Sequence, residues 1–169
     1  MSFVKKIVTA VCLILLVSSL EAQTPLADAQ LKNLRGVVSS FSSLTQKDSI
    51  VLVCFWSINS DASIGELNAI NGHYEKWKQA TPFKMMAVCI DEGNSLSRIR
   101  STVNNNGWTF DVYADINGDL HTALGAGSLP QAMVLKDRRV VYQQSGFGDG
   151  SENYLFSKIQ ALTGSHPKN

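Results

Sequence analysis

The chain has 169 residues, of which 44% are hydrophobic and 17% are charged, and its formal net charge is +1. This size and balance suit one globular domain with a substantial core, and they argue against intrinsic disorder or a coiled coil. A charge so close to zero gives no reason to expect a nucleic-acid partner. The three histidines, His73, His121 and His166, lack the spacing of metal ligands, so we expect no metal.

The first 22 residues have the pattern of a secretory signal peptide. Lys5 and Lys6 precede an apolar run over residues 7–20, and small and polar residues follow, with cleavage predicted after Ala22. The run is shorter than the ~20 apolar residues that a membrane-spanning helix needs. We therefore expect residues 1–22 to be removed on export. Retention of this segment as a membrane anchor is the alternative, and it would be the chain's one membrane contact.

Residues 23–48 are expected to be an N-terminal extension of a main domain over residues 49–165. The apolar residues of this extension fit either a strand pair or a loose amphipathic helix, and they are Leu31, Leu34, Val37, Val38, Phe41 and Leu44. Because Gly36 favours a turn among them, we prefer the strand pair.

The main domain begins with a strand and a long helix. Residues 50–56 form an unbroken apolar run dominated by Val and Ile, which is typical of a strand covered on both faces. Ser60 or Asp61 then caps a helix, and Glu66 is expected to support the cap. Apolar residues recur every three or four positions along this helix until the Thr-Pro pair at 81–82, where we expect it to end.

The remaining segments alternate between strands and helices. We expect a strand at 83–90, a helix at 95–106, a strand at 108–114, a short helix at 120–124, strands at 131–135 and 140–144, and a last helix from 151. Such alternation requires crossover connections and a parallel core. The predicted fold is a three-layer α/β domain, with a mixed sheet of parallel core strands plus a C-terminal β-hairpin, and helices on both faces.

The order of these elements, the sequence Val-Leu-Val-Cys-Phe-Trp at 51–56 and the pair Leu129-Pro130 together resemble the thioredoxin-like superfamily. The best match is the exported TlpA/ResA type of bacterial thiol-disulfide oxidoreductase. The likeness spans nearly all of residues 30–163, and further matching segments lie at 66–67, 88–92, 109–112 and 127–130. It implies a thioredoxin-like fold over residues 49–165, a location in the periplasm or cell envelope of a bacterium, and no cofactor.

By this resemblance, Ser60 and Ser63 occupy the two sulfur positions of the family's Cys-x-x-Cys motif, which here reads Ser-Asp-Ala-Ser. In the family, the first Cys lies at a helix N-terminus, where the helix dipole and free N–H groups lower its pKa. Its thiolate attacks a disulfide, and the second Cys resolves the mixed disulfide. A serine hydroxyl is hardly ionised near neutral pH, so we expect a helix cap at Ser60 or Asp61 and no catalytic residue in this loop.

The same resemblance makes Pro130 a candidate cis-proline that faces the loop. Cis peptide bonds are nearly confined to proline and mark tight turns. The alternative is an ordinary trans bond at the first position of a strand.

The two cysteines beyond the signal segment, Cys54 and Cys89, lie in predicted core strands. We expect buried thiols that pack as small hydrophobic groups, and a disulfide between them is the alternative. In the thioredoxin family, the position of Cys54 often carries a buried acid that moves protons for the resolving Cys. Peroxidase chemistry is not expected, because the Thr-x-x-Cys loop of peroxiredoxins does not follow this strand.

The predicted binding groove lies between the 57–63 loop and the Leu-Pro turn, and its residues are Trp56, Ile58, Ser60, Asp61, Leu129 and Pro130. An extended peptide would bind there through main-chain hydrogen bonds. The predicted function is a protein- or peptide-binding module of the cell envelope that has lost its redox pair, with an unknown envelope protein or peptide as partner. One alternative is an enzyme that uses Cys54 or Cys89, or that supports the active site of a partner. Another is a structural part of a larger envelope complex.

Overall fold

A computed structural model of the chain describes residues 28–91, 96–115 and 117–164. The predicted signal peptide, its cleavage site and the first residues of the N-terminal extension lie outside these ranges. Within them, no helix is long and apolar enough to cross a membrane.

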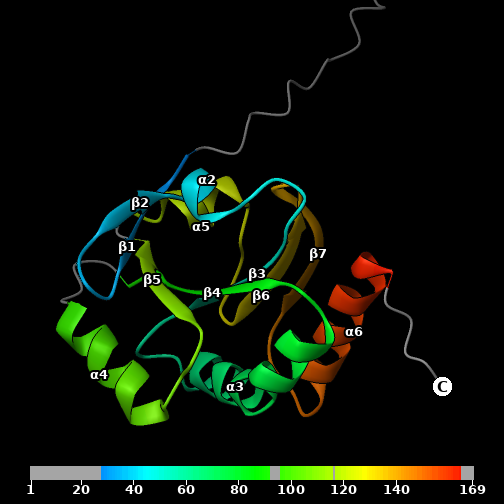
Figure 1. The fold of residues 1–169 in the computed structure, drawn as a ribbon. Coiled ribbons are helices and arrows are strands. Elements are labelled where there is room, and N and C mark those ends of the chain that lie inside the picture. The colour runs from blue at the N-terminus through cyan, green and yellow to red at the C-terminus, as the bar shows by residue number, and fades with distance from the viewer. Residues whose placement is uncertain (1–27, 92–95, 116, 165–169) are drawn as a thin grey trace, which may run out of the picture.

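Seven strands in the described ranges form one mixed sheet, in the order β2-β1-β5-β4-β3-β6-β7 (Figure 1). The strands are β1 (Gln30–Asn33), β2 (Val38–Ser40), β3 (Ile50–Trp56), β4 (Lys84–Cys89), β5 (Asp111–Asp115), β6 (Gln131–Lys136) and β7 (Arg139–Ser145). β3, β4 and β5 are parallel, whereas β6 is antiparallel to β3 and forms a hairpin with β7. The parallel core and the C-terminal hairpin predicted from the sequence are both present.

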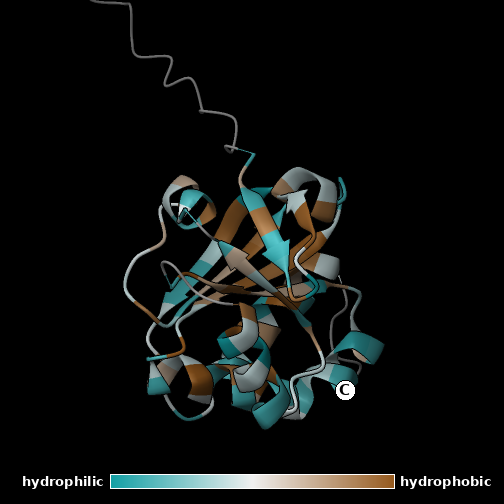
Figure 2. Ribbon diagram, turned by 90° about the vertical axis from the view of Figure 1, so that its left-hand side faces the viewer, coloured by the Kyte–Doolittle hydropathy of each residue, from teal (hydrophilic) through white to brown (hydrophobic). Residues whose placement is uncertain are grey.

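The interior strand β3 lies between two apolar cores. All seven of its residues are buried, and it pairs in parallel with β4 on one side and antiparallel with β6 on the other. Because successive side chains of a strand point to opposite faces, the even-numbered residues of β3 belong to one core and the odd-numbered residues to the other. Figure 2 shows the resulting concentration of apolar residues within the sheet.

Helices cover both faces of the sheet and complete the three layers (Figure 1). The long helices α3 (Asp61–Ala80), α4 (Leu96–Asn106) and α6 (Ser151–Thr163) pack on the core that contains Trp56. The short helices α2 (Phe41–Leu44) and α5 (Asp119–Ala123) pack on the core that contains Phe55. The predicted three-layer fold is confirmed.

The N-terminal extension joins the same sheet as the main domain. β1 and β2 form the predicted antiparallel strand pair, with Gly36 in the turn at a φ of +87°. β1 also pairs antiparallel with β5, so this pair extends the sheet beyond its parallel core. The sequence did not predict α2, a single turn that begins directly after β2 and buries Phe41.

The strand predicted to begin at residue 108 begins instead at Asp111. The preceding residues are held by side chains of α3: Trp108 Nε1 donates to Asn68 Oδ1 (2.7 Å), and the Thr109 N–H donates to Asn71 Oδ1 (3.0 Å). The bond from the Thr109 N–H to α3 takes the place of a ladder bond to β4, and the Trp108 indole holds the segment beside the helix, which explains the shorter strand.

The turn between β6 and β7 fastens the segment around α2 to the main domain. Asp137 and Arg138 both have positive φ, 54° and 63°, which matches the twist that a tight β-hairpin requires. The Arg138 guanidinium donates to the Ser42 carbonyl (2.8 Å) and to the carbonyl and hydroxyl of Thr45 (2.9 and 3.3 Å). The Asp48 N–H donates to Asp137 Oδ1 (2.8 Å). This turn therefore holds residues that lie about ninety positions earlier in the chain.

Arg138→Ala should lower the free energy of unfolding by about 2 kcal/mol, because three acceptors on Ser42 and Thr45 lose a charged donor. Urea denaturation of the wild type and the variant measures the difference. Arg139→Ala is the matched control, since Arg139 is the next residue, is exposed like Arg138 and makes none of these bonds. An equal loss of stability in the two variants would contradict the anchoring role.

Candidate functional site

The loop between β3 and α3 ends in a serine cap. Ser60 is the N-cap of α3, and its Oγ accepts from the Ser63 N–H (3.2 Å) and from the Ser63 hydroxyl (2.8 Å). Ser63 is fully buried, whereas Asp61, the first residue of the helix, is exposed. Ser60 and Ser63 are therefore bonded to each other in a helix-capping arrangement, at the place where the sequence predicts them.

Asp91 holds the first half of the same loop. Its carboxylate accepts from the Ser57 hydroxyl, from the Ile58 N–H (2.8 Å) and from the Cys89 thiol (3.2 Å). The next ladder bond, from the Ile90 N–H to the Trp56 carbonyl (3.0 Å), keeps the ends of β3 and β4 together. The sequence analysis assigned Asp91 no role in the site and included it only in the matching segment 88–92. The available signal was an acidic residue directly after a buried strand, at the edge where the neighbouring parallel strand also ends.

The two described cysteines are free thiols in the core. Cys54 and Cys89 have exposed fractions of 0% and 1%. In the β3–β4 register, Cys54 lies opposite Ala87 and Cys89 lies opposite Trp56, so the two cysteines are not cross-strand neighbours. Burial raises the pKa of the Cys89 thiol to about 12. Burial, with a smaller effect of the Glu66 carboxylate, raises the pKa of Cys54 well above its ordinary value. Both thiols are thus held in the protonated, unreactive form.

Glu66 has a different position from the one predicted for it. It lies on the inner face of α3 beside Leu67, is 2% exposed, and takes no part in the cap. Its Oε2 has no hydrogen-bond partner among the described residues, and burial raises its pKa from 4.5 to about 7. Glu66 lies six positions after the N-cap Ser60, whereas a capping box needs its acidic residue three positions after the N-cap. Glu66 is a buried carboxyl between α3 and the sheet.

Trp56 cannot form the predicted groove wall, because its side chain is 0% exposed. Its ring packs edge-on against Trp108 with centroids 4.9 Å apart, and its Nε1 has no described partner. A residue at the end of a fully buried strand alternates inward as readily as outward, and here it points into the core beneath α3. Of the predicted groove residues, Ile58, Ser60, Asp61 and Leu129 retain exposed surface.

The Leu-Pro turn lies level with this loop. The Leu129–Pro130 peptide bond is cis, and the β3–β6 register, which pairs Phe55 with Gln131, brings Pro130 level with Trp56. The Pro130 carbonyl accepts from the Gly146 N–H (2.9 Å). The Leu129 main chain forms no hydrogen bond with any other described residue.

The Gln131 side chain supports the turn from beneath. Its Oε1 accepts from the Gly127 N–H (3.3 Å) and the Ser145 hydroxyl (2.7 Å), and its Nε2 donates to the Gln144 carbonyl (3.1 Å). The buried amide thereby joins the turn to β7 and fixes its position next to the loop.

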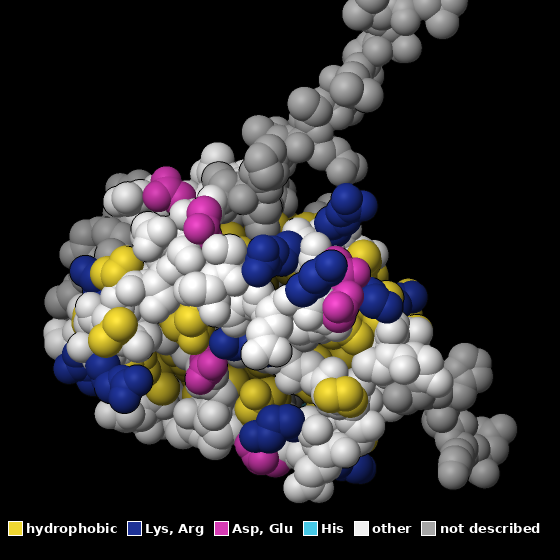
Figure 3. Space-filling view, turned by 45° about the horizontal axis from the view of Figure 1, so that its top comes forward, with side chains coloured by type: hydrophobic (Ala, Val, Ile, Leu, Met, Phe, Trp, Pro, Cys, Tyr) yellow, Lys and Arg dark blue, Asp and Glu magenta, His cyan; other side chains and the backbone are white. Residues whose placement is uncertain are grey.

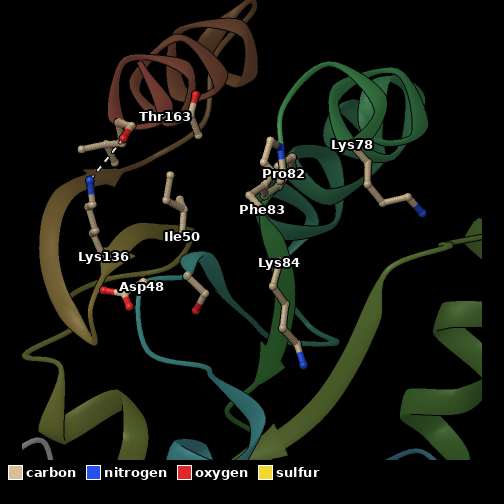
Figure 4. A pocket seen from close by; sticks show the side chains of 10 residues that line it. Asp48, Ile50, Lys78, Pro82, Phe83, Lys84, Lys136 and Thr163 are labelled. Carbon is tan, nitrogen blue, oxygen red and sulfur yellow. Dashed lines mark hydrogen bonds between the residues drawn. The ribbon is translucent and has the colours of Figure 1, made fainter. Parts of the chain in front are cut away.

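A cavity of about 650 Å³ lies at the opposite end of the sheet, where β3 and β4 begin (Figure 4). Ile50, Phe83, Lys84 and Lys136 are among its lining residues. Two of its three lysines join structural elements: Lys136 Nζ donates to the Leu162 carbonyl (3.3 Å), and Lys84 Nζ donates to the Leu44 carbonyl (3.0 Å). Both acidic and basic side chains occur on the face in Figure 3, as the near-zero net charge suggests.

The element order, the cis-Pro turn and the loop that precedes α3 define a thioredoxin-like α/β domain. The AhpC/TSA family model matches residues 22–144, and the chain belongs to this family. A comparison with curated proteins gave no match.

Solved structures of bacterial proteins share the fold. A thioredoxin-like protein of Porphyromonas gingivalis is 28% identical, with a TM-score of 0.71 over 87% of this chain and 95% of that chain. A candidate thiol:disulfide interchange protein DsbE of Chlorobium tepidum is 22% identical, with a TM-score of 0.69 over 82% of this chain and 94% of that chain. A secreted disulfide oxidoreductase of Mycobacterium tuberculosis is 12% identical, with a TM-score of 0.62 over 79% and 96%. The predicted superfamily is confirmed.

Glu66→Gln should reduce the loss of stability that the protein shows between pH 4.5 and 7. The pKa of Glu66 is about 7 in the folded chain and near 4.5 in the unfolded chain, so its contribution is complete below pH 4.5 and is lost as the pH rises to 7. The loss amounts to about 3 kcal/mol at most. Urea denaturation at pH 4.5 and pH 8 measures it. Glu75→Gln, at an exposed position of the same helix, is the control. Equal pH dependence in wild type and Glu66→Gln would contradict the buried, uncharged state.

Asp91→Ala should expose Cys89 to a thiol reagent without denaturant. The change removes the acceptor of three bonds that hold the loop over the end of β4. Labelling followed by peptide mapping distinguishes Cys89 from Cys54. The wild type and the Asp61→Ala control, which leaves these bonds intact, should label at neither site. If Asp91→Ala labels no faster than the wild type, Asp91 does not hold the loop.

Proposed function

We propose that the protein is an exported thioredoxin-like module that binds an extended protein segment and has no thiol redox activity. One observation carries this proposal: Ser60 and Ser63, at the start of α3, are bonded to each other in a helix cap. On this reading the family's Cys-x-x-Cys pair has been replaced by Ser-Asp-Ala-Ser.

The chemistry of these groups favours loss of redox function. Disulfide exchange needs a thiolate that attacks and a second thiol that resolves, and a hydroxyl supplies neither. No His, Lys or Arg occurs between residues 57 and 65, so a base that would activate a serine is missing from this loop. Cys54 and Cys89 are too deeply buried to reach a protein substrate.

Several features support peptide binding at the same place. The Leu129 main chain has a free donor and a free acceptor, as an unpaired strand edge does. Ile58 and Leu129 are half-buried apolar residues that would contact ligand side chains. Asp91 and Gln131 hold the two sides of the site in position before a ligand arrives, which reduces the entropic cost of binding.

Export to a bacterial cell envelope is part of the proposal. It is supported by the basic, apolar and small-residue pattern of residues 1–22 and by the common fold with a secreted disulfide oxidoreductase. The partner would be an envelope protein or a peptide.

The wild-type protein should not reduce insulin with dithiothreitol faster than dithiothreitol alone. The physical reason is the lack of an accessible thiol among the described residues. Turbidity of the insulin B chain follows the reaction. A wild-type rate clearly above the dithiothreitol rate would contradict the proposal and favour an enzyme that uses Cys54 or Cys89.

The double variant Ser60→Cys and Ser63→Cys should gain reductase activity in the same assay. Both new thiols would lie at the N-terminus of a twenty-residue helix, where the first is favoured as a thiolate. Ser40→Cys with Ser43→Cys is a closely matched control, because Ser40 caps α2 through the Ser43 N–H in the same way but away from this turn. A folded 60/63 variant that is no more active than the 40/43 control would show that the site does not retain a thioredoxin-like arrangement.

A further inference from the structure

The loop between β7 and α6 forms a third side of the proposed site, which sequence reasoning did not include. The Gly146 N–H donates to the Pro130 carbonyl (2.9 Å), so the start of this loop is fastened to the cis-Pro turn. The next residue, Phe147, lies against α3 at Gly65, where a Cβ would be 3.5 Å from its ring. The loop therefore spans from the Leu-Pro turn to the first turns of α3.

Phe147 is positioned as an apolar wall. It is half-buried, and Gly146 has a φ of +79°, a conformation that favours glycine and directs the chain toward α3. Because Gly65 has no side chain, the ring rests on the helix surface and does not stand away from it. A half-exposed aromatic ring beside a free main-chain edge is a typical anchor point for a ligand side chain.

The segments that surround Phe147 carry acidic residues and no basic ones. No Lys or Arg occurs in residues 57–65, 127–131 or 145–153. Asp61 and Asp149 are exposed there, Asp61 one helical turn before Gly65 and Asp149 two residues after Phe147. On the adjoining α6, the Lys158 ammonium is already placed over the Tyr154 ring, 4.4 Å from its centroid.

We propose that this site selects an extended peptide segment that carries a basic residue beside a large apolar one. The apolar side chain packs on Phe147, the basic side chain lies near Asp61 or Asp149, and the ligand main chain pairs with Leu129. This inference rests on the proposed binding function and adds the ligand class to it.

Fluorescence anisotropy with four labelled peptides of equal length tests the proposal on the chain purified after its natural export. The peptides share one Gly/Ser background and carry Leu flanked by Lys, Leu flanked by Glu, Leu flanked by Gln, or Ser flanked by Lys. The Lys–Leu peptide should bind at least ~5-fold tighter than the Glu–Leu peptide, an advantage that added salt should reduce. It should bind ~10-fold tighter than the Lys–Ser peptide.

Variants then assign these preferences to residues. Phe147→Ala should weaken all Leu peptides ~10-fold. Gly65→Leu, which keeps Phe147 but fills its place on α3, should do the same. Asp61→Asn with Asp149→Asn should abolish the preference for Lys over Gln and leave the Gln–Leu affinity unchanged. Glu75→Gln, at an exposed position in the second half of α3, is the control and should change neither preference.

The outcomes separate this inference from the proposed function. If the peptides bind but charge makes no difference, or folded Phe147→Ala and Gly65→Leu bind as the wild type does, the ligand class is wrong and the binding function stands. If no peptide binds the folded protein, the binding function fails as well.

Discussion

The carboxylate of Asp91 is the interaction on which the arrangement of the site depends. It binds the Ser57 hydroxyl, the Ile58 N–H and the Cys89 thiol at the point where β3 and β4 both end. One acidic side chain thereby fixes the course of the loop, places Ser60 where it caps α3, and keeps Cys89 covered. Because the carboxylate accepts a main-chain N–H as well as a hydroxyl, it substitutes for ladder bonds that the loop can no longer make.

The pair of serines forms a hydrogen-bonded cap at the start of α3. A serine N-cap is among the most favourable ways to begin a helix, and Ser60 also accepts the hydroxyl of Ser63. The cap satisfies polar groups that would otherwise be left unpaired next to a buried core. Glu66, beneath it, is a buried carboxyl whose pKa of about 7 keeps it largely neutral below that pH. The hydrogen bonds between Ser60 and Ser63 thus stabilise the N-terminal end of α3.

The sequence was a reliable guide where a single segment determines its own structure. The apolar run at β3, the three-or-four periodicity of α3 and the glycine turn between β1 and β2 are all local signals, and each element is present. Their order also predicts the layers, because parallel strands need crossovers and right-handed crossovers leave few topologies.

The positions of individual site residues were harder to predict, since they depend on contacts between distant segments. Trp56 was expected at the surface and is buried, because its direction follows from strand register and not from composition. Glu66 was assigned to the cap and lies in the core, since a carboxyl on an apolar helix face gives no local sign of burial. Asp91 contacts Ile58, which lies 33 positions earlier in the chain, and Phe147 contacts Gly65, which lies still farther back. No local spacing pattern predicts contacts between such distant residues.

The redox state of the thiols is the most direct test of the account. The purified protein is equilibrated in strongly oxidising and in strongly reducing glutathione buffers. Each sample is then unfolded under acid and alkylated, and its mass is measured by mass spectrometry. We predict that Cys54 and Cys89 are both alkylated from either buffer, because neither thiol is accessible in the folded protein. If the oxidised sample carries no alkyl group on Cys54 and Cys89 and the reduced sample carries both, the two thiols form a working redox pair, which would contradict the proposed loss of redox function.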